Sequence, residues 1–178
     1  MTRIRTWTLV ALAASSLGLA ACGSSSADST TTTAATTTPT AKPGIGTVAD
    51  PSPAGTLGTQ PTITVPPGAP PNQLQIKDLI VGTGPAAKPG DQLSMQYVGV
   101  AYSTKQIFDS SWSRNAPFPF VLGGNVIAGW NQGVAGMQAG GRREIIIPPS
   151  LGYGASSPGA GIGANDTLIF IVDLVKIN

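Results

Sequence analysis

The sequence predicts an α+β domain in the C-terminal part of the chain, with one five-stranded antiparallel sheet and one short helix on a face of that sheet. Three observations support this fold class. Five stretches between residues 74 and 178 alternate apolar and polar residues and end at turn-forming Gly, Pro or Asn, which is typical of strands. One stretch spaces its apolar residues three and four positions apart, which is typical of a helix. The residues before position 73 lack the apolar side chains that a core requires.

The predicted strands follow one another with only the helix between them. The third consists of two pieces, because the irregular sequence WSRNA interrupts it. In chain order the strands are Leu74–Gly82, Asp91–Ser103, Lys105–Ser111 with Pro117–Gly123, Arg142–Pro148 and Asp166–Ile177.

The predicted helix is Asn125–Met137. Asn125 is a suitable N-cap, because its side chain can accept a hydrogen bond from a backbone N–H of the first turn. Gly140 and Gly141 follow the segment and favour its termination. The apolar residues at helical spacing are Val126, Ile127, Trp130, Val134 and Met137.

Residues 1–21 have the features of an export signal: basic residues at the start, then an apolar stretch from Trp7 to Leu19. The following sequence LAAC, Leu19–Cys22, resembles the lipobox of bacterial lipoproteins, in which the cysteine is acylated and becomes the new N-terminus. This resemblance implies a lipoprotein signal peptide over residues 1–21 and a lipid on Cys22 that anchors the protein to the bacterial cell membrane, outside the cytoplasm. A plain secretory signal followed by an unrelated cysteine stays open as an alternative.

Residues 22–72 are predicted to be a disordered, lipid-anchored linker. In Ser24–Thr40, twelve of seventeen residues are Ser or Thr, and nine prolines follow between Pro39 and Pro71. Such a composition favours a solvated tether, either bare or carrying O-linked sugar. Residues 73–178 then form the folded domain.

Composition excludes several function classes. The chain has no His and one Cys, so it lacks Ser-His-Asp and Cys-His nucleophiles and an imidazole metal site. Residues 74–178 carry seven Lys or Arg and six Asp or Glu without a basic stripe, which excludes nucleic acid as an expected partner. We expect no metal and no cofactor, and a monomeric protein.

Seven short motifs in the domain resemble the FKBP family, the macrolide-binding peptidyl-prolyl cis/trans isomerases, in their order and near-identical spacing. The resemblance spans residues 74–178 and implies a curved antiparallel sheet wrapped around a short helix. The motifs are YVG, FDSS, RNAPFPFVLG, VIAGW, GVAGM, GRREIIIPPSLGYG and TLIFIVDLVKI.

The resemblance also implies an apolar cavity with the Trp130 indole as its floor. It assigns a catalytic role to Asp109, Tyr153, Trp130 and Phe170, and a substrate-binding role to Tyr97, Phe108, Arg114, Phe118, Val126, Ile127 and Ile162. The Ile127 N–H would hydrogen-bond a substrate carbonyl, and Phe120 would face the same side as Phe118, at the border of the core.

Two departures from the family pattern concern substrate preference and macrolide affinity. The sequence LGGNVIAGW is one residue shorter before the helix than the commonest pattern, so we expect the backbone that presents Ile127 to be reshaped. Pro158 and Gly161 replace larger side chains and should flatten one wall of the cavity.

Two functions remain for this domain. The first is a peptidyl-prolyl cis/trans isomerase that acts on X-Pro bonds of exported or envelope proteins by non-covalent binding in a dry aromatic pocket. The second is a tethered chaperone module that binds Pro-containing peptides with little turnover. Macrolide inhibitors are expected ligands by family resemblance.

Overall fold

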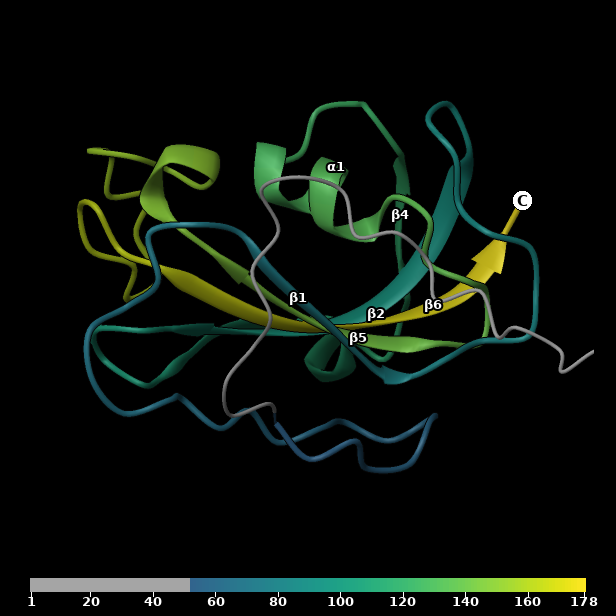
Figure 1. Cartoon of the computed structure of the whole chain (residues 1–178), viewed down its shortest axis with the longest axis horizontal. Coiled ribbons are helices and arrows are strands. Elements are labelled where there is room, and N and C mark those ends of the chain that lie inside the picture. The colour runs from purple at the N-terminus through teal and green to yellow at the C-terminus, as the bar shows by residue number, and fades with distance from the viewer. Residues whose placement is uncertain (1–51) are drawn as a thin grey trace, which may run out of the picture. The chain divides into compact units, whose positions relative to one another are not determined.

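The structure is a computed structural model that describes residues 52–178; the predicted signal peptide, Cys22 and the first part of the predicted linker lie outside this range. None of the helices in this range has the length and apolar content that crossing a bilayer requires. The sheet and its helices are shown in Figure 1. The strands are β1 (Gln75–Ile80), β2 (Gln92–Ala101), β3 (Ile107–Ser110), β4 (Phe118–Val121), β5 (Arg142–Ile147) and β6 (Leu168–Ile177), and the helices are η1 (Trp112–Arg114), α1 (Ala128–Val134) and η2 (Pro149–Leu151).

The strands form one antiparallel sheet in the spatial order β1-β5-β6-β2-β3, with β4 also paired to β2. β3 pairs with Val98–Val100 of β2, and β4 pairs with Gln92–Met95. The two short strands therefore follow one another along the same strand, as expected for a third strand interrupted by WSRNA. The interruption is η1, and the predicted fold class is confirmed.

α1 is shorter than the predicted helix, and the prediction of Asn125 as N-cap is wrong. Ile127 occupies the N-cap position with φ −57° and ψ 146°, and no side chain caps the helix there. At the other end, Gly136 has φ 75° and donates its N–H to the carbonyl of Ala87, 2.8 Å away. The apolar spacing continues beyond both ends. The extended conformation of Ile127 and the hydrogen bond of Gly136 to Ala87 nevertheless confine the helix to seven residues.

α1 lies close against one face of the sheet, which we call the inner face (Figure 1). A Cβ placed on Gly129 would lie 2.4 Å from Ile147 Cγ2, and one on Gly133 would lie 2.7 Å from Ile145 Cγ2. The two glycines therefore allow the helix to approach β5 without a gap. The inner face and α1 share one buried cluster that includes Leu93, Met95, Trp130, Val134, Ile145, Leu168, Phe170 and Val172.

The opposite, outer face is covered by residues 52–68, which we call the strap. In Figure 1 this segment is drawn in blue and runs on the side of the sheet away from α1. Ile63 and Val65 pack there against Tyr102, Ile146 and Ile169. The expectation of a disordered linker is wrong for this part of residues 22–72, because these two apolar side chains have a surface to cover that composition does not reveal.

The strap also provides partners for charged groups buried on the outer face. The Arg142 side chain is 0% exposed and forms a double hydrogen bond with Asp173, at 2.6 and 2.7 Å. Its remaining donors reach the carbonyls of Ala54 and Thr59 in the strap, at 2.9 and 2.8 Å. Since a buried charge without partners is strongly destabilising, the strap completes an arrangement that the sheet alone leaves open.

Candidate active site

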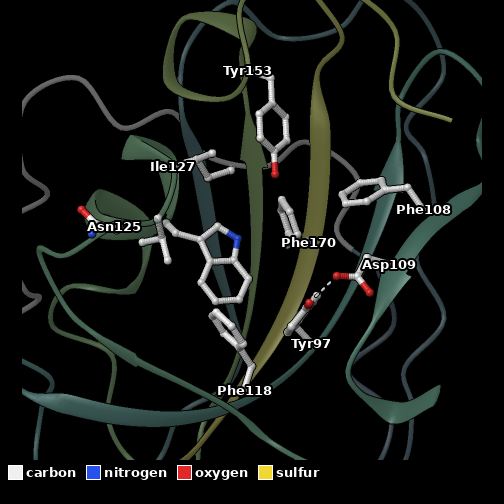
Figure 2. Close-up of a pocket in the computed structure, with 10 residues that line it drawn as sticks. Tyr97, Phe108, Asp109, Phe118, Asn125, Ile127, Tyr153 and Phe170 are labelled. Carbon is white, nitrogen blue, oxygen red and sulfur yellow. Dashed lines mark hydrogen bonds between the residues drawn. The ribbon is translucent and has the colours of Figure 1, made fainter. Parts of the chain in front are cut away.

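A cavity of about 480 Å³ opens beside the N-terminal end of α1, and Figure 2 shows its lining as sticks. Its residues come from five elements and from the loops that follow β4 and η2. They are Tyr97, Phe108, Asp109, Phe118, Asn125, Val126, Ile127, Trp130, Tyr153 and Phe170.

Trp130 holds the aromatic residues of the cavity together. Its side chain projects from α1 and is 4% exposed. It meets Tyr97 of β2 at a ring distance of 5.2 Å and 87°, Phe170 of β6 at 5.3 Å and 87°, and Phe118 of β4 at 6.1 Å and 85°. Edge-to-face contacts of this kind add stability beyond the area that they bury, so the indole is fixed between three strands.

Phe118 and Phe120 lie on the same side of β4, as strand alternation predicts. Their rings stack at 6.0 Å with an interplanar angle of 17°. Phe118 lines the cavity, whereas Phe120 is 8% exposed and contacts Trp130 from the core side. Phe120 therefore supports the wall that Phe118 forms.

Phe108 reaches the cavity because β2 has a glycine beneath it. The ring of Phe108 lies 5.4 Å from that of Phe170, edge to face. A Cβ on Gly99 would lie 2.5 Å from Phe108 Cζ and 2.8 Å from Phe170 Cε1. Gly99 is not among the predicted site residues, although an isolated glycine between two valines in a strand indicates a close approach of this kind.

Three polar side chains form a network at one edge of the cavity. The Tyr97 hydroxyl donates to Asp109 Oδ2, the contact drawn as a dashed line in Figure 2. Arg114 Nη1 donates to Asp109 Oδ1 at 2.5 Å, and Arg114 Nη2 donates to the Tyr97 hydroxyl at 2.7 Å. Arg114 also lies over the Tyr97 ring, 5.6 Å from its centre. The network fixes the tyrosine that forms one wall.

The network shifts the ionisation of both acidic members. Burial, followed by the hydrogen bond to the Asp109 carboxylate, raises the pKa of Tyr97 to about 12. Burial opposes ionisation of Asp109, but hydrogen bonds from Arg114, Tyr97 and the Ser110 N–H outweigh it and hold the pKa of that carboxyl below its ordinary value. At neutral pH, Asp109 is therefore ionised and Tyr97 is neutral.

Several hydrogen-bond donors at the cavity have no partner within residues 52–178. Two of them are the backbone N–H of Ile127, which precedes the first residue of α1, and the hydroxyl of Tyr153. Figure 2 shows the Tyr153 hydroxyl directed toward the space between Ile127 and Phe108. Both donors are free to bind a ligand in the cavity.

The structure brings most of the predicted site residues together, while their roles in catalysis and binding stay predictions. Ile162 does not line the cavity; it is 6% exposed and belongs to the buried cluster beside it. Arg114 contacts the site through Asp109 and Tyr97 instead of lining it. Asn125, predicted only as a cap, is part of the lining because its loop runs past the cavity before α1 begins.

The cavity offers apolar and aromatic surface together with a few donors, and such a lining suits a compact apolar group next to a peptide carbonyl. In the part of the chain that the structure describes, no three His, Cys, Asp or Glu side chains gather as a metal site would require.

Comparison with known proteins gives a consistent family. The sequence profile described as FKBP-type peptidyl-prolyl cis-trans isomerase matches residues 84–175. The chain is 52% identical over 120 residues to the FK506-binding protein of Streptomyces anulatus, a match that covers 66% of this chain and 97% of that protein. It is 45% identical over 117 residues to the probable FK506-binding protein of Corynebacterium glutamicum, covering 66% of this chain and 98% of that protein.

The fold is similar to that in the crystal structure of AtFKBP13. The TM-score is 0.54 and the sequence identity 35%, in a match that covers 61% of this chain and 96% of the other. This likeness agrees with the family match.

Proposed function

The chain belongs to the FKBP-type peptidyl-prolyl cis-trans isomerase family, and we propose that the aromatic cavity binds the prolyl ring of an X-Pro peptide and accelerates rotation about that bond. The observation that carries this proposal is the set of edge-to-face rings around Trp130, with the free Ile127 N–H beside them. The rings match a compact apolar five-membered ring, and the N–H matches a peptide carbonyl next to it.

The proposed reaction needs no acid, base or nucleophile. Rotation about an X-Pro bond meets a barrier of about 18–20 kcal/mol because the planar amide is resonance-stabilised. The planar amide is dipolar and well solvated, whereas the twisted transition state has lost conjugation and carries less charge on its oxygen. A dry aromatic cavity therefore disfavours the ground state more than the transition state. An acceleration of about 1,000-fold requires only about 4 kcal/mol of this difference.

The residues take separate roles in this mechanism. Trp130 and Phe170 form the surface for the prolyl ring, and the Ile127 N–H donates to a substrate carbonyl and orients it. Asp109, which is ionised, holds the Tyr97 wall and places negative charge at the edge of the cavity. The Tyr153 hydroxyl is the second donor available to the peptide.

We further propose that the clients are exported or envelope proteins. LAAC at Leu19–Cys22 supports this proposal, together with the Ser- and Thr-rich residues after it. A lipid on Cys22 would hold the domain at the outer side of the cell membrane, where newly exported chains fold. Mass spectrometry of the protein from bacterial membranes, compared with Cys22→Ser, tests this: an unmodified Cys22 in the membrane-bound form contradicts it.

Macrolides are proposed inhibitors, since related proteins carry the name FK506-binding protein. A macrolide with a prolyl-like ring would occupy the same aromatic surface as the substrate. Inhibition would therefore be competitive with the peptide.

The proposal is tested with the full chain and a chromophoric X-Pro peptide, by following its cis-to-trans rate. Trp130→Ala and Tyr153→Phe remove the floor and one donor, and Val175→Ala, an exposed residue away from the cavity, is the control. We expect the chain to accelerate the cis-to-trans rate of the peptide. The acceleration should fall in the first two variants and when FK506 is added, and it should be unchanged in the control. Binding of the peptide without acceleration, for several residues before proline, would instead support the chaperone module.

A further inference from the structure

The loop of residues 122–127 joins β4 to α1 and carries three residues of the cavity lining, Asn125, Val126 and Ile127. Its first residue, Leu122, donates its N–H to the Asp91 carbonyl at 2.9 Å and accepts the Gly90 N–H at 2.8 Å. The hydrogen bonds within the rest of the loop are short-range. Gly124 N–H donates to the Val121 carbonyl at 2.9 Å, and Val126 N–H donates to the Gly124 carbonyl at 2.9 Å. These two bonds close tight turns, but neither connects the loop to α1.

Asn131, in the second turn of α1, makes that connection. Its Oδ1 accepts a hydrogen bond from the Gly123 N–H at 2.8 Å, and its Nδ2 donates to the Gly124 carbonyl at 3.1 Å. One carboxamide thus binds two peptide groups of the loop, the one before Gly123 and the one after Gly124. Because Gly123 offers a donor and Gly124 an acceptor, only a group with both functions satisfies the two at once.

The backbone of Asn131 contacts the other end of the loop. Its N–H lies 3.4 Å from the carbonyl oxygen of Ile127, which also accepts the Trp130 N–H at 3.0 Å. Asn131 therefore contacts the loop on both sides of Asn125 and Val126. Gly123 has φ 91°, a conformation that a side chain would resist, and nothing lies within 4 Å of a Cβ placed there. Beyond Leu122, this turn is therefore held by the contacts from Asn131 and by the hydrogen bond from Gly124 to Val121, and not by packing around Gly123.

We propose that Asn131 is a positioning residue for the isomerase site: its carboxamide holds the loop of residues 122–127 in the conformation that places Val126 and Ile127 at the cavity. It does so by binding the backbone of the loop directly. The kinetic consequence rests on the isomerase function proposed above, because Ile127 is the donor assigned to the substrate carbonyl there.

The test compares Asn131→Ala, Asn131→Asp and the control Gln132→Ala in the full chain. Gln132 is the next residue of α1 and is exposed, without a side-chain hydrogen bond to residues 52–178. Asp keeps the size of Asn, and its carboxylate still accepts from Gly123. An ionised carboxylate cannot donate to the Gly124 carbonyl and repels that oxygen; a protonated one can donate again.

We expect kcat/KM of Asn131→Ala to fall by about ten- to a hundredfold, the scale of a displaced contact group, and Gln132→Ala to match the unaltered chain. Asn131→Asp should resemble Asn131→Ala at pH 7 and recover as the pH is lowered through about 4. The unaltered chain and Gln132→Ala, measured at the same pH values, contain the same Asp109, and the recovery is read relative to them. Peptide exchange followed by NMR, with a peptide that lacks ionisable side chains, gives the rates.

Unchanged kcat/KM in Asn131→Ala would overturn the proposal, as would an Asn131→Asp variant that follows Asn131→Ala at every pH. If the unaltered chain does not accelerate isomerisation, the isomerase function fails, and the loop is judged by its amide resonances alone. Two changes would support the positioning role. One is faster hydrogen exchange of the Gly123 amide in Asn131→Ala. The other is a change in the amide chemical shifts of Ile127 and Gly123 in Asn131→Asp that titrates near pH 4. Absence of both changes would contradict it.

Discussion

Tyr97 serves both the apolar and the polar part of the site. Its ring packs edge to face on Trp130 and Phe118, while its hydroxyl donates to Asp109 and accepts from Arg114. A phenol held between a carboxylate and a guanidinium cannot rotate away from the cavity without breaking two charge-assisted hydrogen bonds. The charged edge therefore stabilises the shape of the apolar wall.

Asp109→Asn should lower the pKa of Tyr97 from about 12 toward its ordinary value near 10, because the neutral amide no longer disfavours the tyrosinate. A raised pKa in the folded state means stability that is complete below about pH 10 and is lost as the pH rises through about 12. In Asp109→Asn this alkaline loss should be smaller and should be complete at a lower pH, because it still begins near the unfolded-state pKa. Ultraviolet titration of tyrosinate and melting temperature against pH measure both effects, and Tyr97→Phe identifies the late-titrating group.

Gly99→Ala should narrow the cavity from its floor. The added methyl overlaps Phe108 and Phe170, so both rings must move, at a cost of about 1–3 kcal/mol in unfolding free energy and with weaker prolyl-peptide binding. The control is Gly163→Ala, where φ lies outside the left-handed region and the nearest atom to the new Cβ, Asp166 Oδ2, is at 3.9 Å. Calorimetric binding and chemical denaturation of both variants test this, and equal effects in the two would contradict it.

At the scale of elements, β5 connects the two faces of the sheet. Its inward Ile145 and Ile147 contact α1, and its outward Glu144 meets the strap. The Arg143 guanidinium donates to the Gly133 carbonyl at the end of α1 and pairs with Asp78 of β1. One strand thus fixes the position of the helix that carries Trp130 and Asn131.

The strap is attached to β5 chiefly at Ser52. The Ser52 N–H and hydroxyl both donate to the Glu144 carboxylate, and the hydroxyl accepts the Thr64 N–H at 2.9 Å. Burial raises the pKa of Glu144, while the hydrogen bonds from Ser52 act in the opposite direction. The ionised carboxylate therefore depends on the strap for its partners.

Ser52→Ala should cost about 1–3 kcal/mol of stability at pH 7 and less below the ordinary pKa of Glu144. Because the folded-state pKa of Glu144 is raised, its contribution to stability is greatest at low pH and declines as Glu144 ionises. Loss of Ser52 raises this pKa further. The penalty of the substitution therefore appears only where the carboxylate is charged. Denaturation at pH 4 and pH 7 measures this. Thr62→Ala, exposed on the same strap, is the control, and a penalty independent of pH would contradict the prediction.

At the scale of the described molecule, the two faces of the sheet have separate tasks. The inner face and α1 form the cavity, and the outer face with the strap satisfies Arg142, Glu144 and Asp173. The chain enters the described region at Ser52, on the outer face. Substrate and strap therefore occupy opposite surfaces of the same strands.

A chain that begins at Ser52 should unfold at nearly the same denaturant concentration as the full chain. One that begins at Ala69 should be clearly less stable, because Arg142 loses two carbonyl partners and Tyr102, Ile146 and Ile169 lose their apolar cover. The midpoint of unfolding in urea measures the difference. Equal midpoints for the two truncations would show that the strap contributes no stability.

The sequence by itself determined the fold class, the strand set with its interruption, and most of the cavity lining. Alternation and turn residues are properties of each segment and predict the strands. The resemblance of the seven motifs to the FKBP family implies that Tyr97, Trp130 and Phe170 line one cavity, as they do. The strand and helix patterns are local, so each segment shows its own pattern whatever other segments it packs against.

Only the tertiary structure decided the features that depend on contacts between distant segments. Helical spacing extends from Asn125 to Met137, yet α1 is confined to Ala128–Val134 by its backbone contacts. Gly99 matters because Phe108 and Phe170 meet above it, and Ser52 is ordered because Glu144, 92 residues later, needs a partner. From its composition, the strap is predicted to be solvated. The surface on which it packs belongs to the strands and exists only after the sheet has formed, so the composition of the strap does not reveal it.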